Sequence, residues 1–205
     1  EYQRQQRYRF ERDRHRDLIA RALVRTCLSQ YANVDPECWR FERGEHGKPQ
    51  VTEPSIDLNF NLSHSHDLVA CAIARKPVGV DIEYCGRPND VLAIAERYFS
   101  ATESRALFAL PEHAQRERFF DYWTLKEAYM KARGEGISLG LGNFSFDLST
   151  DETIAVGFHD SLGDDPAAWQ FRLLRPEPEY RLALALREAS APIRLEIFRG
   201  APGAW

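Results

Sequence analysis

The order of the predicted helices and strands constrains the fold of this chain more than any other feature. Apolar residues at helical spacing predict a first helix, and short β-like segments follow at 39–42, 58–62, 68–74 and 78–83. Three helical patterns come next, at 91–98, 102–109 and 116–132. Further β-like segments end the chain, at 144–148, 153–158, 169–174, 180–186 and 194–198. Because helices and strands come in separate runs, the order predicts an α+β fold with small, mostly antiparallel sheets, not a parallel β/α sheet.

The length of the chain limits its domain organisation. With 205 residues it can form one large domain or two small lobes, and two similar halves meeting near residues 75–80 would suit this order. The longest purely apolar run, 68–74, is far shorter than the ~20 residues that cross a bilayer, which excludes a transmembrane enzyme. No signal peptide is visible, and a cytoplasmic location is expected, although the lack of a leading Met suggests that the true N-terminus is missing from this sequence.

Charge and cysteine content narrow the possible functions. The formal net charge of −4 argues against a general nucleic-acid binder. The four cysteines, at positions 27, 38, 71 and 85, form no C-x-x-C pair and are predicted to be buried free thiols, which suits a reducing compartment. Lysine and arginine together number 27, and only four of these residues are lysines, at 48, 76, 126 and 131. Each Lys therefore marks a special site or stands there by chance.

Two acidic residues alternate along the predicted strand at 78–83. Asp81 and Glu83 point to one face of this strand, while Val80 and Ile82 point to the other, into a core. Carboxylates about 6.6 Å apart along a strand can converge on one cation, and Mg²⁺ is commonly held by one or two carboxylates together with substrate phosphates. The alternative is an exposed acidic strand face without a metal.

The longest helical pattern carries a second group of polar residues. Trp123, Glu127 and Lys131 recur every four residues and form one stripe of the helix. A Glu followed by Lys at this spacing is often only a surface pair that contributes ~0.2–0.5 kcal/mol. This helix is rich in aromatic residues, however, and is therefore predicted to be mostly buried. Trp123 is interpreted as a packing residue.

Two short polar motifs complete the candidates. The apolar runs at 58–62 and 68–74 flank a polar break and predict two strands joined by a tight loop. At the end of the first run, Ser63 and His64 can contact a phosphate or orient a base, or they can be structural. Lys48 stands in a Gly-Lys-Pro turn, which is a weak signal by itself. No order or spacing indicates a Ser-His-Asp triad.

Together, these segments resemble the 4′-phosphopantetheinyl transferase superfamily, in its long, surfactin-synthetase-priming type. The motifs stand in family order as GKP at 47–49, FNLSHS at 60–65, GVDIE at 79–83 and WTLKEAYMK at 123–131. The resemblance implies a monomer with two lobes related by a pseudo-twofold axis, predicted at 1–77 and 78–205. It also implies transfer of the 4′-phosphopantetheine arm of coenzyme A to a serine of an apo carrier protein. Adenosine 3′,5′-bisphosphate is released, and Mg²⁺ is required.

The resemblance assigns roles to residues of the C-terminal lobe. Asp81, Glu83 and Glu127 would hold Mg²⁺ on the coenzyme A diphosphate, since three carboxylates without a cation repel one another. Glu127 is also the candidate general base. Lys131, one turn further along, would meet the diphosphate oxygens as the nucleotide leaves.

The same resemblance places coenzyme A on the N-terminal lobe. Lys48 and Pro49 would lie beside the adenine, and Ser63 and His64 would contact phosphates. Arg12 and Arg16 would suit the 3′-phosphate, because a guanidinium matches phosphate oxygens in a fork geometry.

The partner is expected to be an acidic acyl or peptidyl carrier protein, docked on the segment 91–99, which follows Arg87 and contains Arg97, with neither nucleic acid nor membrane involved. Two alternatives remain open. A Mg²⁺-dependent phosphohydrolase of a nucleotide diphosphate would use the same acids with water as the nucleophile, and a carrier-binding module would keep the fold without catalysis. The sequence does not indicate which carrier protein is modified.

Overall fold

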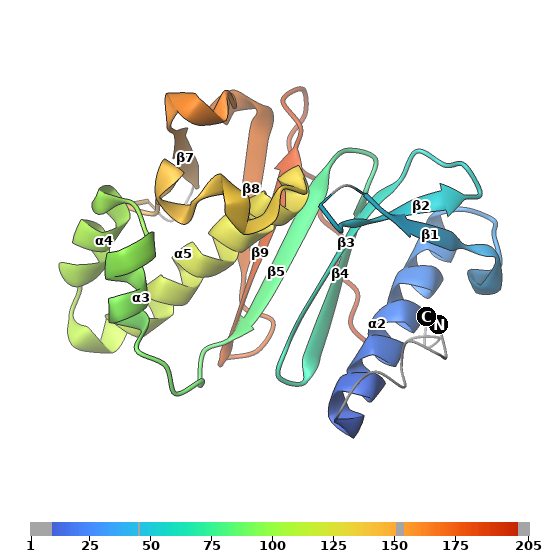
Figure 1. The fold of residues 1–205 in the computed structure, drawn as a ribbon, viewed down its shortest axis with the longest axis horizontal. Helices are drawn as coiled ribbons and strands as arrows, with labels where there is room; N and C mark the ends of the chain where they lie inside the picture. Colours follow the sequence, from blue (N-terminus) through green and yellow to red (C-terminus); the bar gives the residue numbers. More distant parts are fainter. Residues whose placement is uncertain (1–9, 45, 151–153, 201–205) are drawn as a thin grey trace.

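Helices and short strands alternate in runs along the chain (Figure 1), and the computed structural model describes residues 10–44, 46–150 and 154–200. The α-helices are α2 (Glu11–Tyr31), α3 (Val91–Tyr98), α4 (Ala101–Phe108) and α5 (Glu112–Arg133). The strands are β1 (Arg40–Arg43), β2 (Pro49–Glu53), β3 (Asn59–Ser65), β4 (Leu68–Ala74), β5 (Val78–Tyr84), β6 (Phe144–Asp147), β7 (Ala155–Phe158), β8 (Trp169–Leu174) and β9 (Tyr180–Arg187). Short 3₁₀ turns lie at Pro36–Cys38, Gly136–Leu139, Leu141–Asn143, Asp160–Leu162 and Pro166–Ala168.

All strand pairs in the described residues are antiparallel. The pairs β1–β2, β3–β4 and β6–β7 form separate two-stranded sheets, and β5, β9 and β8 form a three-stranded sheet in that order. The predicted hairpin is present, with Ser65 opposite Leu68 at its turn. The α+β prediction is therefore confirmed.

Two local predictions are wrong. Residues 194–198 form no strand, and their apolar side chains, Leu195, Ile197 and Phe198, are exposed instead of packed. An alternating pattern predicts a strand only where a neighbouring strand supplies the missing hydrogen bonds. Cys38 is exposed and the other three cysteines are only partly buried, so the prediction of buried thiols is wrong, although all four cysteines are free.

The buried hydrophobic residues form two clusters. One lies between α2 and the β3–β4 pair and contains Val24, Leu28, Trp39 and Phe60. The other surrounds α5, which lies along β5 and β9 (Figure 1). These clusters suit two lobes, while the boundary at 77/78 and the pseudo-twofold relation stay predictions. None of the described helices combines the length and apolar character needed to span a membrane.

Helix α5 packs very closely on β5, and a glycine permits this approach. A Cβ atom at Gly79 would lie 2.0 Å from the carbonyl oxygen of Ala128, so no larger residue fits there without a shift of the backbone. The helix ends at Gly134, which adopts a φ of 78°. This contact brings the acidic face of β5 alongside the polar stripe of α5.

Candidate active site

The candidate site begins where β3 and β5 lie side by side but belong to separate sheets, so their backbones are not paired with each other. Three alternate residues of β3 bridge the gap with their side chains. The oxygens Oδ1 of Asn61, Oγ of Ser63 and Oγ of Ser65 accept the backbone N–H groups of Val80 (2.9 Å), Ile82 (3.2 Å) and Tyr84 (2.9 Å). Buried backbone N–H groups need partners, and the two-residue period of β3 presents these three side chains to one face.

Asp81 lies at the centre of this junction and is only 4% exposed. Its Oδ1 atom accepts hydrogen bonds from Ser63 Oγ at 2.8 Å and from Lys131 Nζ at 2.6 Å. The Lys131 ammonium also donates to Ser63 Oγ at 2.9 Å and to the carbonyl of Val80 at 3.3 Å. The second oxygen, Oδ2, is buried and has no hydrogen-bond partner. An unpaired buried carboxylate oxygen is costly unless a ligand satisfies it.

Glu83 is held in a similar way one step further along β5. Its Oε2 atom accepts from Ser65 Oγ at 2.8 Å and pairs with the Arg87 guanidinium at 2.8 Å. Arg87 also donates to Ser65 Oγ at 2.6 Å. Among the described residues, no hydrogen bond reaches the other oxygen, Oε1.

Glu127 contributes a third carboxyl from α5. Burial, together with the negative charges of Asp81 and Glu83 and against the opposing charge of Lys131, raises its pKa to about 7. Burial likewise raises the pKa of Asp81 to about 6, although Lys131 opposes the shift. The carboxyls on β5 and α5 are thus close enough to repel one another. Trp123, on the same stripe, stacks on Phe119 with ring centroids 5.7 Å apart, which fits its interpretation as a packing residue.

The acids fit a divalent cation in two respects. A cation would satisfy the buried Oδ2 atom of Asp81, and it would remove the repulsion that raises the pKa of Glu127. As the side chains lie, the described part of the chain gathers no three His, Cys, Asp or Glu residues into a ready ligand set. Joint binding by Asp81, Glu83 and Glu127 therefore stays a prediction, and phosphate oxygens of a substrate commonly complete a Mg²⁺ shell.

The raised pKa values of Asp81 and Glu127 predict an unusual pH dependence of stability. Each binds its proton more tightly in the folded than in the unfolded chain, so protonation stabilises the fold. The stabilisation is fully present below the ordinary values of 3.8 and 4.5 and is lost as pH rises through about 6 for Asp81 and about 7 for Glu127. Without Mg²⁺, we expect Glu127→Gln to flatten the fall in unfolding free energy between pH 5 and 8, measured by urea titration. Equal pH slopes for both proteins would contradict the raised pKa of Glu127.

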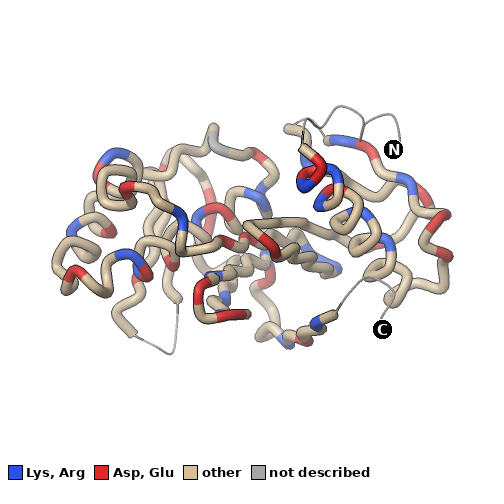
Figure 2. The backbone as a smooth tube through the Cα atoms, turned by 90° about the horizontal axis from the view of Figure 1, so that it is seen from below, with Lys and Arg blue, Asp and Glu red and all other residues tan. Residues whose placement is uncertain are grey.

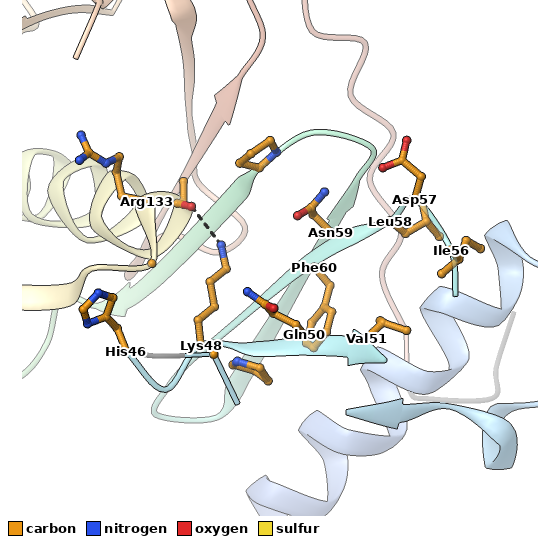
Figure 3. A pocket seen from close by; sticks show the side chains of 15 residues that line it. His46, Lys48, Gln50, Val51, Ile56, Asp57, Leu58, Asn59, Phe60 and Arg133 are labelled. Atoms are coloured by element: carbon orange, nitrogen blue, oxygen red, sulfur yellow. Dashed lines mark hydrogen bonds between the residues drawn. The ribbon is translucent and has the colours of Figure 1, made fainter. Parts of the chain in front are cut away.

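Lys48 and Pro49 line a pocket of about 540 Å³ beside the end of α5 (Figure 3). The Lys48 ammonium donates to the carbonyls of Val78 at 3.2 Å and Ala132 at 3.1 Å, and burial lowers its pKa to about 8. Lys48 thereby joins the β1–β2 region to both β5 and α5. The pocket is also lined by Gly44, His46, Gln50, Val51, Ile56, Asp57, Leu58, Asn59, Phe60, Pro77, Ala132, Arg133 and Gly134.

The remaining predicted residues lie along α2 and the exposed side of β3. Figure 2 shows basic and acidic residues interspersed along α2. Arg16 pairs with Asp13 at 2.7 Å, whereas Arg12 reaches Asp67 in the β3–β4 turn at 3.0 Å. His64 lies near Arg16 and Lys131. Its burial and the charge of Arg16 lower the pKa of the imidazole, and the charge of Lys131 lowers it further. Ser63, in contrast, points inward to Asp81.

Sequence reasoning missed the part that Asn61, Ser65 and Arg87 play in this junction. The two-residue alternation of β3 was a usable signal for Asn61 and Ser65, because both share the face of Ser63. No local pattern indicates that Arg87 pairs with Glu83, since the chain leaves β5 between them.

Comparisons with known proteins identify the family. A family model described as the 4′-phosphopantetheinyl transferase superfamily matches residues 77–185, and one described as the 4′-phosphopantetheinyl transferase N-terminal region matches residues 1–76. The chain belongs to the 4′-phosphopantetheinyl transferase superfamily. The prediction of a transferase that primes carrier proteins is thereby confirmed.

Two curated relatives match more than nine-tenths of the sequence of this transferase. The 4′-phosphopantetheinyl transferase psf-1 of Bacillus pumilus is 38% identical over 94% of this chain and 79% of its own. The 4′-phosphopantetheinyl transferase Sfp of Bacillus subtilis is 33% identical over 91% of this chain and 80% of its own. The solved holo-[acyl-carrier-protein] synthase of Thermotoga maritima overlaps 56% of this chain and 64% of its own, with a TM-score of 0.45 and 23% identity.

Proposed function

We propose that this transferase takes the 4′-phosphopantetheine arm from coenzyme A with the help of Mg²⁺ held by Asp81, Glu83 and Glu127. The buried, unpartnered Oδ2 atom of Asp81 carries this proposal, because it lies beside two further carboxyls and the Lys131 ammonium. Bound Mg²⁺ would neutralise charge on the diphosphate and orient it.

The reaction breaks the phosphoanhydride bond of coenzyme A and forms a phosphate ester with the carrier. The serine Oγ of the carrier bonds to the β-phosphorus of coenzyme A, and the bond from that phosphorus to the oxygen of the leaving adenosine 3′,5′-bisphosphate breaks. Glu127, which lies beside Asp81 and Lys131, would take the serine proton. Lys131 places its ammonium on the diphosphate oxygens, which leave with added negative charge.

Coenzyme A binding is assigned to the side of the molecule that carries Lys48 and α2. Lys48 and Pro49 would flank the adenine at the pocket of about 540 Å³, which is large enough for a nucleobase. His64, Arg16 and Arg12 would bind phosphates.

Ser63 would bind a phosphate only by exchange. Its hydroxyl already donates to Asp81 and accepts from Ile82 and Lys131, which uses its whole hydrogen-bonding capacity. A phosphate oxygen only accepts hydrogen bonds, so Ser63 can bind one only if its O–H, its single donor, turns away from Asp81.

The carrier protein would dock on α3, where positive charge would speed its encounter with the enzyme. Arg97 remains available there, with its guanidinium 5.2 Å from the centre of the Tyr98 ring, while Arg87 is also engaged by Glu83. A monomer with lobes at 1–77 and 78–205, located in the cytoplasm, completes the proposal.

Mass spectrometry of an apo carrier mixed with the protein, coenzyme A and Mg²⁺ tests this function. We expect the carrier to gain the mass of one phosphopantetheine and adenosine 3′,5′-bisphosphate to appear in equal amount, and chelation of the metal should stop both. Release of free phosphopantetheine without a carrier would instead support a hydrolase. Tight binding of several apo carriers without any mass gain would support a non-catalytic module.

A further inference from the structure

The two acidic residues of β5 are each held by one serine of β3, in the same manner. Ser63 accepts the N–H of Ile82 and donates to Oδ1 of Asp81, and Ser65 accepts the N–H of Tyr84 and donates to Oε2 of Glu83. In both pairs the serine binds the backbone of the residue after the acid and one oxygen of the acid itself. Oδ2 of Asp81 is buried without a partner among the described residues, and the bonds that hold Glu83 all reach Oε2 rather than Oε1.

Ser65 is well suited to fix the orientation of a carboxylate. Its side chain is buried, with the residue 1% exposed, and its hydroxyl makes its full set of bonds: one donated to Glu83 and two accepted, from Tyr84 N–H and Arg87. The Arg87 guanidinium grips the same Oε2 atom at 2.8 Å. Rotation of the Glu83 carboxylate would break both of its bonds at once, the one from Ser65 and the one from Arg87.

The chain beyond Ser65 anchors it as well. His66 has a φ of 51°, a left-handed conformation that few residues other than glycine adopt without cost. Its ring stacks on Tyr84, with ring centroids 4.5 Å apart. The turn that follows Ser65 is thus held against the end of β5, beside Glu83.

We propose that Ser65 is a positioning residue for Glu83: it holds Oε2, together with Arg87, so that Oε1 is presented to the cation. This inference rests on the proposed function, because it requires that Glu83 binds the metal. Residues that orient metal ligands from the next layer commonly change metal affinity by about 10–100-fold.

Calorimetric titration of Mg²⁺ into the protein saturated with coenzyme A tests this role. Ser65→Ala should weaken Mg²⁺ binding about tenfold, and Ser65→Thr, which keeps the hydroxyl, should restore affinity close to that of the wild type. Ser104→Ala is the matched control, since it removes a partly buried hydroxyl that donates to the carbonyl of Ala95, away from the three acids.

The possible outcomes separate the two levels of the argument. If the wild type binds Mg²⁺ and Ser65→Ala binds it equally well, the positioning role is overturned while the proposed function stands. Lower melting temperature with unchanged affinity would show that Ser65 only supports the fold. If the wild type does not bind Mg²⁺ with coenzyme A present, the metal site itself is wrong, and this inference is overturned with it.

Discussion

Asp81→Asn should lower the kcat/KM of phosphopantetheinyl transfer by at least about 10³-fold, which corresponds to about 4 kcal/mol of lost transition-state stabilisation. The substitution keeps the size of the side chain but removes its charge, and it places an amide NH₂ on one of the two oxygen positions. Asp81 is the most central of the three acids, with one oxygen bonded to Ser63 and Lys131 and the other free for a cation. Initial rates with an apo carrier across a Mg²⁺ series measure the effect.

A second measurement separates loss of metal binding from loss of folding. Mg²⁺ with coenzyme A should raise the melting temperature of the wild type, because a ligand that binds the native state stabilises it, and should leave that of Asp81→Asn nearly unchanged. Asp35→Asn is the control, since Asp35 is exposed and caps its short turn without a side-chain hydrogen bond. An Asp81→Asn enzyme with more than a tenth of wild-type activity would contradict the proposed site.

Lys126→Met should reduce the free energy of unfolding by about 3–5 kcal/mol, the usual cost of removing one partner of a buried ion pair. Lys126 and Glu103 are both fully buried, with Nζ and Oε2 2.8 Å apart. The ammonium also donates to the carbonyls of Leu141 at 2.7 Å and Phe144 at 2.6 Å. Burial is the main influence on Lys126 and lowers its pKa, whereas Glu103 favours the charged form. Methionine would leave the buried Glu103 charge without a cationic partner and would remove the hydrogen bonds to both carbonyls.

Urea denaturation of three proteins measures this effect and its cause. The double variant Lys126→Met/Glu103→Gln should recover part of the loss, because a neutral amide no longer carries an unpaired charge. The amide oxygen can still accept the N–H of Phe146, as the Glu103 Oε1 atom does at 2.9 Å. A free energy of unfolding of Lys126→Met within about 0.5 kcal/mol of the wild-type value, the ordinary range for surface substitutions, would show that the ion pair does not stabilise the fold.

The lysines show how far a sequence signal reaches. Lysine is rare in this chain, and three of the four donate to backbone carbonyls: Lys48 to Val78 and Ala132, Lys126 to Leu141 and Phe144, and Lys131 to Val80. The compact ammonium, with three donors, suits such sites better than the planar guanidinium. Rarity left two interpretations of these positions open, a special site or chance, and no pattern identified the carbonyls, which lie up to 84 residues away in the chain.

Periodicity and motif order alone determined the α+β class, the shared face of Asp81 and Glu83, and the transferase family, because these depend on local backbone geometry and on residue identity. Tertiary structure alone decided that Asn61, Ser63 and Ser65 complete the hydrogen bonds of β5, and that one oxygen of Asp81 is left buried and free. It also decided that residues 194–198 do not form a strand. The physical reason is that a buried polar group must find its partner in space, and the partner is brought there by packing rather than by sequence.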